Sequence, residues 1–546
     1  MRFGAVDGAR GSLVEVLIIG AGPAAAGAAM ALSESPDVSV RVLDVGGRLE
    51  ERNERARERM SQRPPSEWSA DDVDLVGRVA EATEYQRLPE KRNFGSDFPF
   101  RDFGQLAGVR GIGDVNTHVI SGAYGGFSNT WGAQTMVYSA ASFGDWPISR
   151  ADLEPDYRAI LSKIPYSAEE DDLAEYHPLW AGADPLPPLN ANSTRILECY
   201  RRHRTSVRRH GVIVGKARLA LNGSACVSCG LCMTGCPYSY VYSASQTFDR
   251  LIAAGRISYT GAREALSIGE TAGRPFVVSR DTHSGALETI YADRILVGCG
   301  AIGSTRLVAS SLELWSQPLH LQESAQFLMP LASLRSTGDL TQDDSFTLNQ
   351  FNILMPFDEA GRDLVQIHGY PYSKSMDDAL PAVLRTSFGR VIGNALLKHV
   401  TVGLGYLPSW WSPGFDVTIE KPEAQDRPAR VNIIAAARTD DVTKSKLRAI
   451  NAKLLRVAPY LGVVPVVPMV SMSPPGKSYH FGGSFPHAAN PVSGRESDLA
   501  GRVEPWRNIH LIDAAVFPNV SATTFTLTIM ANAHRIARHV AEDARA

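Results

Sequence analysis

Four cysteines near the middle of the chain have the spacing of metal ligands. Their pattern is C-x2-C-x2-C-x3-C-P, and its members are Cys226, Cys229, Cys232 and Cys236. In bacterial iron–sulfur proteins, tight turns in such a run bring thiolates around a cluster, and the fourth cysteine serves a second cluster. This chain has no second run, so Cys236 or the remote Cys199 or Cys299 completes the cluster, or the cluster lacks one iron.

The same spacing leaves other chemistry open. Zinc fits less well, because structural zinc sites normally use two short knuckles separated by a longer loop. Reduced structural thiols and a disulfide are the remaining alternatives for residues 226–236. The sequence therefore predicts an iron–sulfur site, with reduced thiols, zinc and a disulfide as rival interpretations.

A glycine-rich turn near the N-terminus has the form of a dinucleotide site. Residues 14–44 read VEVLIIGAGPAAAGAAMALSESPDVSVRVLD, a strand, a turn, an alanine-rich helix and a second strand. Gly20 permits the tight turn, and Gly22 lets a pyrophosphate approach the helix N-terminus, whose dipole stabilises the phosphate charge. The third motif position is Ala25, and Asp44 ends the second strand, where a carboxylate can bind a ribose. We therefore expect a bound dinucleotide.

Composition limits the class of protein. The chain has 546 residues, 44% of them hydrophobic and 21% charged, with a net charge of −3. This length predicts two or more domains, and the charge gives no reason to expect binding to nucleic acid or anionic membranes. No apolar run is long enough to predict a transmembrane segment. With four of six cysteines grouped together, we expect a reducing, cytoplasmic location.

Further segments have the periodicity of elements that would position such a site. LVGCGAIGSTRL, residues 296–307, repeats the strand–glycine–helix pattern and adds a parallel strand beside the cofactor. Strand-like runs, several of them alternating, extend over residues 346–436, and a helix with apolar repeats follows at 447–461. We expect these runs to form a second domain, whose antiparallel sheet binds the substrate.

Four pieces in this order resemble the glucose–methanol–choline family of FAD-dependent oxidoreductases. They are GAGPAAAG with Asp44, then GGFSNTWG, LVGCGAIGSTRL, and HFGG followed by HLIDAAVFPNVSATTFTLTIMANA. The resemblance implies an α/β fold: a Rossmann-like FAD domain built from discontinuous segments, and an α+β substrate domain whose antiparallel sheet roofs the flavin. The FAD-binding parts would be 1–150, 206–314 and 473–546. Residues 151–205 would form a connecting segment on the substrate side, and residues 315–472 would form the substrate-binding domain.

The resemblance also implies site residues. The catalytic base would be His480, which takes the alcohol proton while hydride passes to flavin N5. Thr524 stands where the family has a second His or Asn and can hydrogen-bond a substrate oxygen without acting as a base. The residues left to compensate are Asn519, Asn532 and His534. The cofactor contacts would be Gly20, Gly22, Ala25, Asp44, Gly125, Gly126, Ser128, Asn129, Trp131, Gly132 and Asp513.

The expected reaction is oxidation of CH–OH to C=O, most readily on a sugar, glycoside or cyclitol. The electrons would pass to oxygen or to a redox partner protein. A steroid or long-chain alcohol oxidase is one alternative, and it predicts an apolar pocket between the domains. The other is a non-catalytic flavin and iron–sulfur electron carrier or redox sensor, in which residues 226–236 are the working part.

Overall fold

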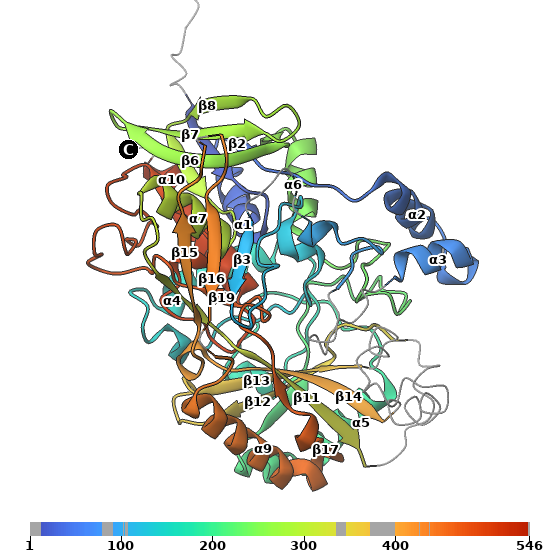
Figure 1. Ribbon diagram of the computed structural model, residues 1–546. Coiled ribbons are helices and arrows are strands. Elements are labelled where there is room, and N and C mark those ends of the chain that lie inside the picture. Colours follow the sequence, from blue (N-terminus) through green and yellow to red (C-terminus); the bar gives the residue numbers. More distant parts are fainter. Residues whose placement is uncertain are drawn as a thin grey trace, which may run out of the picture.

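The protein has two lobes, one built on a parallel sheet and one on a larger antiparallel sheet (Figure 1). The computed structural model describes residues 13–78, 91–101, 103, 108–334, 345–371, 399–424, 426–435 and 437–543. The predicted α/β class, with a parallel sheet and a separate antiparallel sheet, is confirmed.

The parallel sheet has five strands in the order β20-β9-β1-β2-β5. Its strands are β1 (Val14–Ile19), β2 (Val38–Leu43), β5 (Ser258–Thr260), β9 (Arg294–Val297) and β20 (Ile509–Leu511). Every neighbouring pair is parallel, although the strands come from widely separated parts of the sequence. The apolar β-branched strands are buried on both faces, as expected for a parallel sheet covered by helices.

Helices cover this sheet. The helices that share its hydrophobic core are α1 (Pro23–Leu32), α4 (Arg150–Leu161), α6 (Ala244–Ala253), α7 (Ala301–Ser311) and α10 (Thr526–Asp543). Helix α1 packs so closely on α10 that a Cβ at Gly27 would lie 2.4 Å from the Met530 carbonyl oxygen. The antiparallel strands β6 (Arg263–Thr271), β7 (Arg274–Asp281) and β8 (Leu287–Tyr291) cap this lobe, and α2 (Glu51–Ser61) and α3 (Ala70–Val76) project from it (Figure 1).

The second lobe contains an antiparallel sheet in the order β17-β11-β14-β13-β12-β4, with β18 also paired to β11. Its strands are β4 (Ile213–Lys216), β11 (Gln326–Ser333), β12 (Phe351–Pro356), β13 (Leu364–Tyr370), β14 (Val400–Tyr406), β17 (Val463–Pro465) and β18 (Ser471–Met472). Helices α5 (Ala191–Arg209) and α9 (Asp441–Leu461) cover the face away from the other lobe (Figure 1). Strand β4, which lies within residues 206–314, pairs with β12 of this sheet.

A smaller sheet, in the order β19-β10-β15-β16-β3, lies between the two. Its strands are β3 (Val109–Ile112), β10 (Leu319–Glu323), β15 (Phe415–Glu420), β16 (Arg430–Ile434) and β19 (Phe481–Gly482). Among the helices of the described ranges, none combines the length and hydropathy that a membrane span requires.

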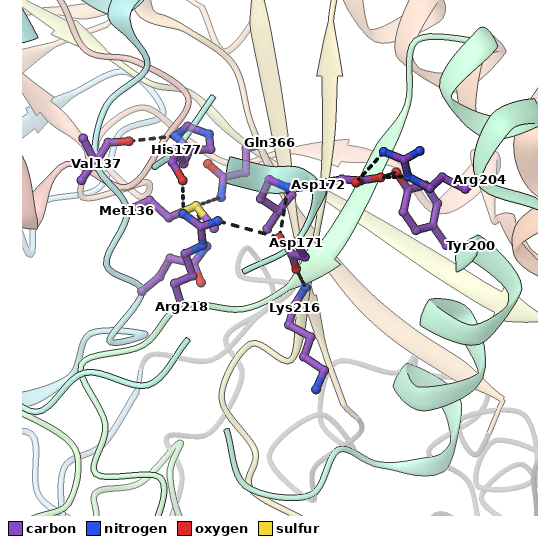
Figure 2. Close-up of polar contacts among 12 residues, drawn as sticks. Met136, Val137, Asp171, Asp172, His177, Tyr200, Arg204, Lys216, Arg218 and Gln366 are labelled. Carbon is purple, nitrogen blue, oxygen red and sulfur yellow. Dashed lines mark hydrogen bonds and ion pairs between the residues drawn. The ribbon is translucent and has the colours of Figure 1, made fainter. Parts of the chain in front are cut away.

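A buried ionic cluster joins residues 151–205 to the antiparallel sheet that contains β4. Figure 2 shows the Arg218 guanidinium donating to the His177 carbonyl and lying 3.8 Å from the Asp171 carboxylate. Asp171 also accepts from the Lys216 N–H of β4 at 2.7 Å. Because Arg218 is only 1% exposed, these contacts fix the connecting segment rather than bind a ligand.

Candidate functional site

A cavity of about 410 Å³ extends from the carboxyl edge of the parallel sheet to the antiparallel sheet that contains β11, β13 and β14. At one end it is lined by the turn after β1, including Gly20 and Gly22, and by Asp44. At the other end it is lined by His480 and by Tyr406 of β14. The two groups of residues predicted to bind a dinucleotide and to do chemistry therefore share one cavity.

The first turn leaves room for a phosphate. Gly20 has φ +101°, and a Cβ there would lie 2.5 Å from the Gly298 carbonyl oxygen. By contrast, a Cβ on Gly22 would meet no atom within 4 Å, although Gly22 immediately precedes α1 and lines the cavity. Gly20 is thus required by the fold, whereas Gly22 keeps open the space above a helix N-terminus, where an anion is stabilised. Ala25 is buried within α1.

Asp44 lies at the end of β2 and lines the same part of the cavity. Its carboxylate accepts a hydrogen bond from the Tyr259 hydroxyl at 3.1 Å. Burial raises the pKa of Asp44 to about 7, partly offset by that hydrogen bond and by nearby backbone N–H groups. A buried carboxylate of this kind gains stability from the hydroxyl groups of a ribose.

A second turn completes the parallel edge. Gly300, with φ +79°, caps the N-terminus of α7, and a Cβ there would also meet nothing within 4 Å. Asp513 lies beside it, accepting from Ser304 Oγ at 2.5 Å and from the Ala515 N–H at 2.9 Å. Burial raises the pKa of Asp513 to about 6. Asp513 therefore both caps a short turn and lines the cavity.

The glycine-rich loop of residues 125–132 touches the first turn. A Cβ on Gly126 would lie 3.3 Å from the Gly22 Cα, so the loop and the turn close around the same space. The loop residues that line the cavity are Gly126, Ser128, Trp131 and Gly132. Gly125 adopts a left-handed conformation with φ +95°, and Asn129 donates to the carbonyls of Tyr124 and Gly126, so these two shape the loop itself.

His480 lies between two aromatic rings at the opposite end. Its ring stacks on Tyr406 with centroids 4.7 Å apart and contacts Phe525 at 4.9 Å. The Nδ1 atom is buried and has no hydrogen-bond partner among the residues that the structure describes, and burial lowers the pKa of His480 to about 3. The imidazole is therefore neutral at physiological pH and can accept a proton from a group in the cavity.

Glu323, at the end of β10, holds the loop that carries His480. Its carboxylate accepts from the Gly476 N–H at 2.9 Å and from the Ser478 hydroxyl at 2.6 Å. Ser478 Oγ in turn accepts from the His480 N–H at 3.0 Å. Burial raises the pKa of Glu323 to about 7. A lone glutamate in a strand offers no local sequence signal, and sequence analysis therefore missed it.

The roof of the cavity is largely apolar and aromatic. Val402, Leu404 and Tyr406 alternate along β14 and so share the face that lines the cavity, beside Tyr370 of β13. Gln326 of β11 adds an amide. In sequence these residues have the pattern of an ordinary buried strand, and only the pairing of β11, β13 and β14 shows that they line a site.

The residues considered as a second catalytic group lie elsewhere. Thr524 is buried and donates to the Gln134 carbonyl at 3.2 Å, and it does not line the cavity. His534 on α10 bonds Asp156 of α4 at 2.6 Å. Asn519 accepts from the Trp146 indole N–H, and Asn532 contacts His487. These groups hold helices and loops together, and the hydroxyl predicted to contact a substrate oxygen does not reach the cavity.

The cysteine segment does not form the predicted metal centre. Within the described ranges no three His, Cys, Asp or Glu side chains are grouped so that they could hold a metal ion, and the cysteines are free. The structure therefore does not support an iron–sulfur cluster on Cys226, Cys229, Cys232 and Cys236. Burial raises the pKa of Cys229 to about 11 and of Cys232 to about 12, which keeps these thiols protonated near neutral pH. Spacing specifies only how far apart the cysteines lie along the chain, and it does not fix the directions in which their side chains point.

Comparison with known proteins identifies the fold. No family model matches the chain, and no curated protein sequence matches it. Among solved structures, that of pyridoxine 4-oxidase from Mesorbium loti superposes with a TM-score of 0.59 at 12% identity. The match covers 96% of this chain and 99% of the other. The comparison therefore confirms the two-lobed α/β fold that the sequence predicted.

Proposed function

We propose that the chain is an FAD-dependent oxidoreductase that oxidises the CH–OH group of a small alcohol. The observation that carries this proposal is the shared cavity, which joins a phosphate-binding turn at Gly22 to a neutral, buried histidine at His480. The likeness to the solved pyridoxine oxidase supports it, since both chains have the same fold over nearly their whole length.

The residues present fit FAD. The space above Gly22 and the two helix N-termini at α1 and α7 suit a pyrophosphate, and the buried carboxylate of Asp44 suits a ribose. The ring of His480 lines the far end of the same cavity. A bound flavin would supply the acceptor for the hydride that leaves the alcohol carbon.

The chain's own contribution to the chemistry is the proton. His480 has its Nδ1 buried, so Nε2 is the ring nitrogen that faces the cavity. This nitrogen accepts the hydroxyl proton of the alcohol. The aromatic neighbours Tyr406 and Phe525 exclude water and hold the ring in place. The protonated imidazole is stabilised by the negative charge that the alcohol oxygen gains when it loses its proton.

The lining favours an apolar or aromatic alcohol over a sugar. Val402, Leu404, Tyr370 and Phe525 present hydrocarbon and ring faces near His480, with the amide of Gln326 and the hydroxyl of Tyr406 among them. A sugar carries several hydroxyl groups that need polar partners when buried. The solved neighbour is a pyridoxine 4-oxidase, and pyridoxine is an alcohol on an aromatic ring.

Anaerobic titration tests the proposal. The purified protein should contain FAD, and benzyl alcohol or pyridoxine should bleach its flavin absorbance faster than glucose, myo-inositol or decanol. Air and a dye acceptor added afterwards separate an oxidase from a dehydrogenase. Faster bleaching by glucose would indicate that the substrate is a sugar. If dithionite bleaches the flavin but no alcohol does, the electron-carrier alternative is favoured.

A further inference from the structure

In the proposed reaction, no residue named so far stabilises the negative charge on the alcohol oxygen. When the alcohol loses its proton, negative charge builds on its oxygen, and a hydrogen-bond donor aimed at that oxygen lowers the barrier. Thr524 cannot be this donor, because its hydroxyl is turned to the Gln134 carbonyl and lies outside the cavity. His480 cannot do both tasks, because its cavity nitrogen accepts the proton.

Tyr406 is placed beside the proton acceptor. Its ring stacks on His480, with centroids 4.7 Å apart and planes inclined by 27°, and it lines the same cavity. His368 of β13 packs on Tyr406 at 4.9 Å, and burial lowers the pKa of His368 to about 3. The tyrosine ring is therefore held between two neutral imidazoles, and its position is fixed by packing.

The hydroxyl group of Tyr406 has one defined contact. Gln326 Nε2 donates to the Tyr406 oxygen at 3.0 Å. The amide is itself oriented, because Gln326 Oε1 accepts from the Ser473 hydroxyl at 2.9 Å. Tyr406 is thus an acceptor toward Gln326, and within the described ranges its own proton has no acceptor. Burial raises the pKa of Tyr406 to about 12, so the hydroxyl keeps this proton at neutral pH.

The geometry points to Tyr406 as a second catalytic residue, whose O–H donates a hydrogen bond to the oxygen of the alcohol. This assignment rests on the proposed function. The alcohol O–H bond breaks and its proton passes to His480 Nε2, while a bound flavin would accept the hydride that leaves the carbon. Tyr406 keeps its own proton throughout, and it stabilises the charge on the oxygen until the C=O bond has formed. Gln326 is a positioning residue, which acts by orienting the Tyr406 hydroxyl.

Tyr406→Phe tests the assignment, with Tyr157→Phe as the matched control. The first variant keeps the stacked ring and loses only the hydroxyl. The control removes a buried hydroxyl of similar kind, bonded to Thr528 at 2.7 Å and outside the cavity. In anaerobic stopped-flow with benzyl alcohol, we expect Tyr406→Phe to slow flavin reduction about 100-fold with unchanged FAD content. The control should reduce at the wild-type rate.

A Gln326→Leu variant tests the same contact without altering the tyrosine. It should slow reduction less than Tyr406→Phe, and the double variant should be no slower than Tyr406→Phe alone, because both changes act through one hydroxyl. Additive losses would instead assign Gln326 an independent role and overturn the positioning argument.

Binding supplies a readout that does not depend on turnover. 4-Nitrophenol can donate its proton toward His480 and accept from Tyr406, and its absorbance reports its complex directly. We expect Tyr406→Phe to weaken its binding about tenfold and Tyr157→Phe to leave it unchanged. If Tyr406→Phe binds 4-nitrophenol and reduces its flavin as the wild type does, the assignment of Tyr406 is overturned. The proposed function is then still tested separately by His480→Ala. If wild-type flavin is not bleached by any alcohol, the proposed function and this assignment both fail.

Discussion

The two ends of the cavity are built by different means. At the nucleotide end the contacts come from backbone turns at Gly20, Gly22 and Gly300, each at the end of a parallel strand. At the alcohol end they come from the side chains of His480 and Tyr406, carried by a loop and by an antiparallel strand. Backbone turns are set by short local motifs, whereas the meeting of side chains depends on tertiary packing. The first end should therefore control affinity for the cofactor, and the second the rate.

The largest effect that separates the two ends is expected for His480→Ala. Loss of the proton acceptor should slow flavin reduction by about 1,000-fold, while FAD remains bound because no contact at the nucleotide end changes. Stopped-flow reduction and the FAD-to-protein ratio measure both outcomes. His320→Ala is the matched control, since His320 is exposed and pairs with Asp416 on the surface. A rate within tenfold of wild type would remove His480 from the role of base.

The nucleotide end can be tested with two glycines that have opposite surroundings. Gly22→Ala should fold normally, because its φ of −85° suits alanine and no atom lies within 4 Å of the added Cβ. It should nevertheless weaken FAD binding about tenfold or more, because the methyl group occupies the space of the phosphate. Isothermal titration of the cofactor-free protein measures this affinity.

Gly20→Ala is the counterpart and should damage the fold itself. Its φ of +101° and the 2.5 Å approach to the Gly298 oxygen should lower the free energy of unfolding by about 2 kcal/mol or more. Urea denaturation of the cofactor-free variants compares them. Equal stability of the two alanine variants would contradict the division between a fold glycine and a ligand glycine.

The difference between the two ends also explains what the sequence could predict. The motif from Gly20 to Asp44 specifies a strand, a turn and a helix within one stretch, so its geometry follows from local rules. Tyr406 and Glu323 have no such local signature, because their roles arise from the pairing of β11 with β14 and from a loop that returns to β10. The fold class could be predicted because the strand–glycine–helix unit occurs twice, and the structure pairs the strands of both units, β1 and β9, in one parallel sheet.

Two sequence expectations find no support in the structure, for a related reason. Thr524 stands at the expected place along the chain, yet its hydroxyl finds the Gln134 carbonyl instead of the cavity. The cysteines of residues 226–236 have the spacing of ligands, yet the turns do not bring three of them into a metal-binding group in the described structure. Spacing limits which groups can meet, but the direction of each side chain is set by its neighbours in space.

The alcohol end also makes stability depend on pH through Glu323. A carboxyl group whose folded pKa, about 7, lies above its ordinary value of 4.5 binds more protons when folded. Its contribution to stability is therefore greatest below pH 4.5 and declines as pH rises through 7. Glu323→Gln keeps an oxygen for Ser478 and removes this titration. The variant should gain about 3 kcal/mol relative to wild type between pH 4 and pH 8, measured by urea denaturation without cofactor. A constant difference across this range would show that Glu323 titrates normally.

The smallest effect is expected for Thr524→Val. This variant tests whether the Thr524 hydroxyl belongs to the alcohol end of the cavity. Valine keeps the shape of the side chain and loses the hydroxyl that donates to the Gln134 carbonyl, which should lower the free energy of unfolding by about 1 kcal/mol. Because this hydroxyl does not line the cavity, the rate of flavin reduction should stay within about threefold of wild type. A loss as large as that expected for Tyr406→Phe would mean that the Thr524 hydroxyl turns into the cavity during the reaction. The donor to the alcohol oxygen would then be the threonine at the family position rather than the tyrosine of β14.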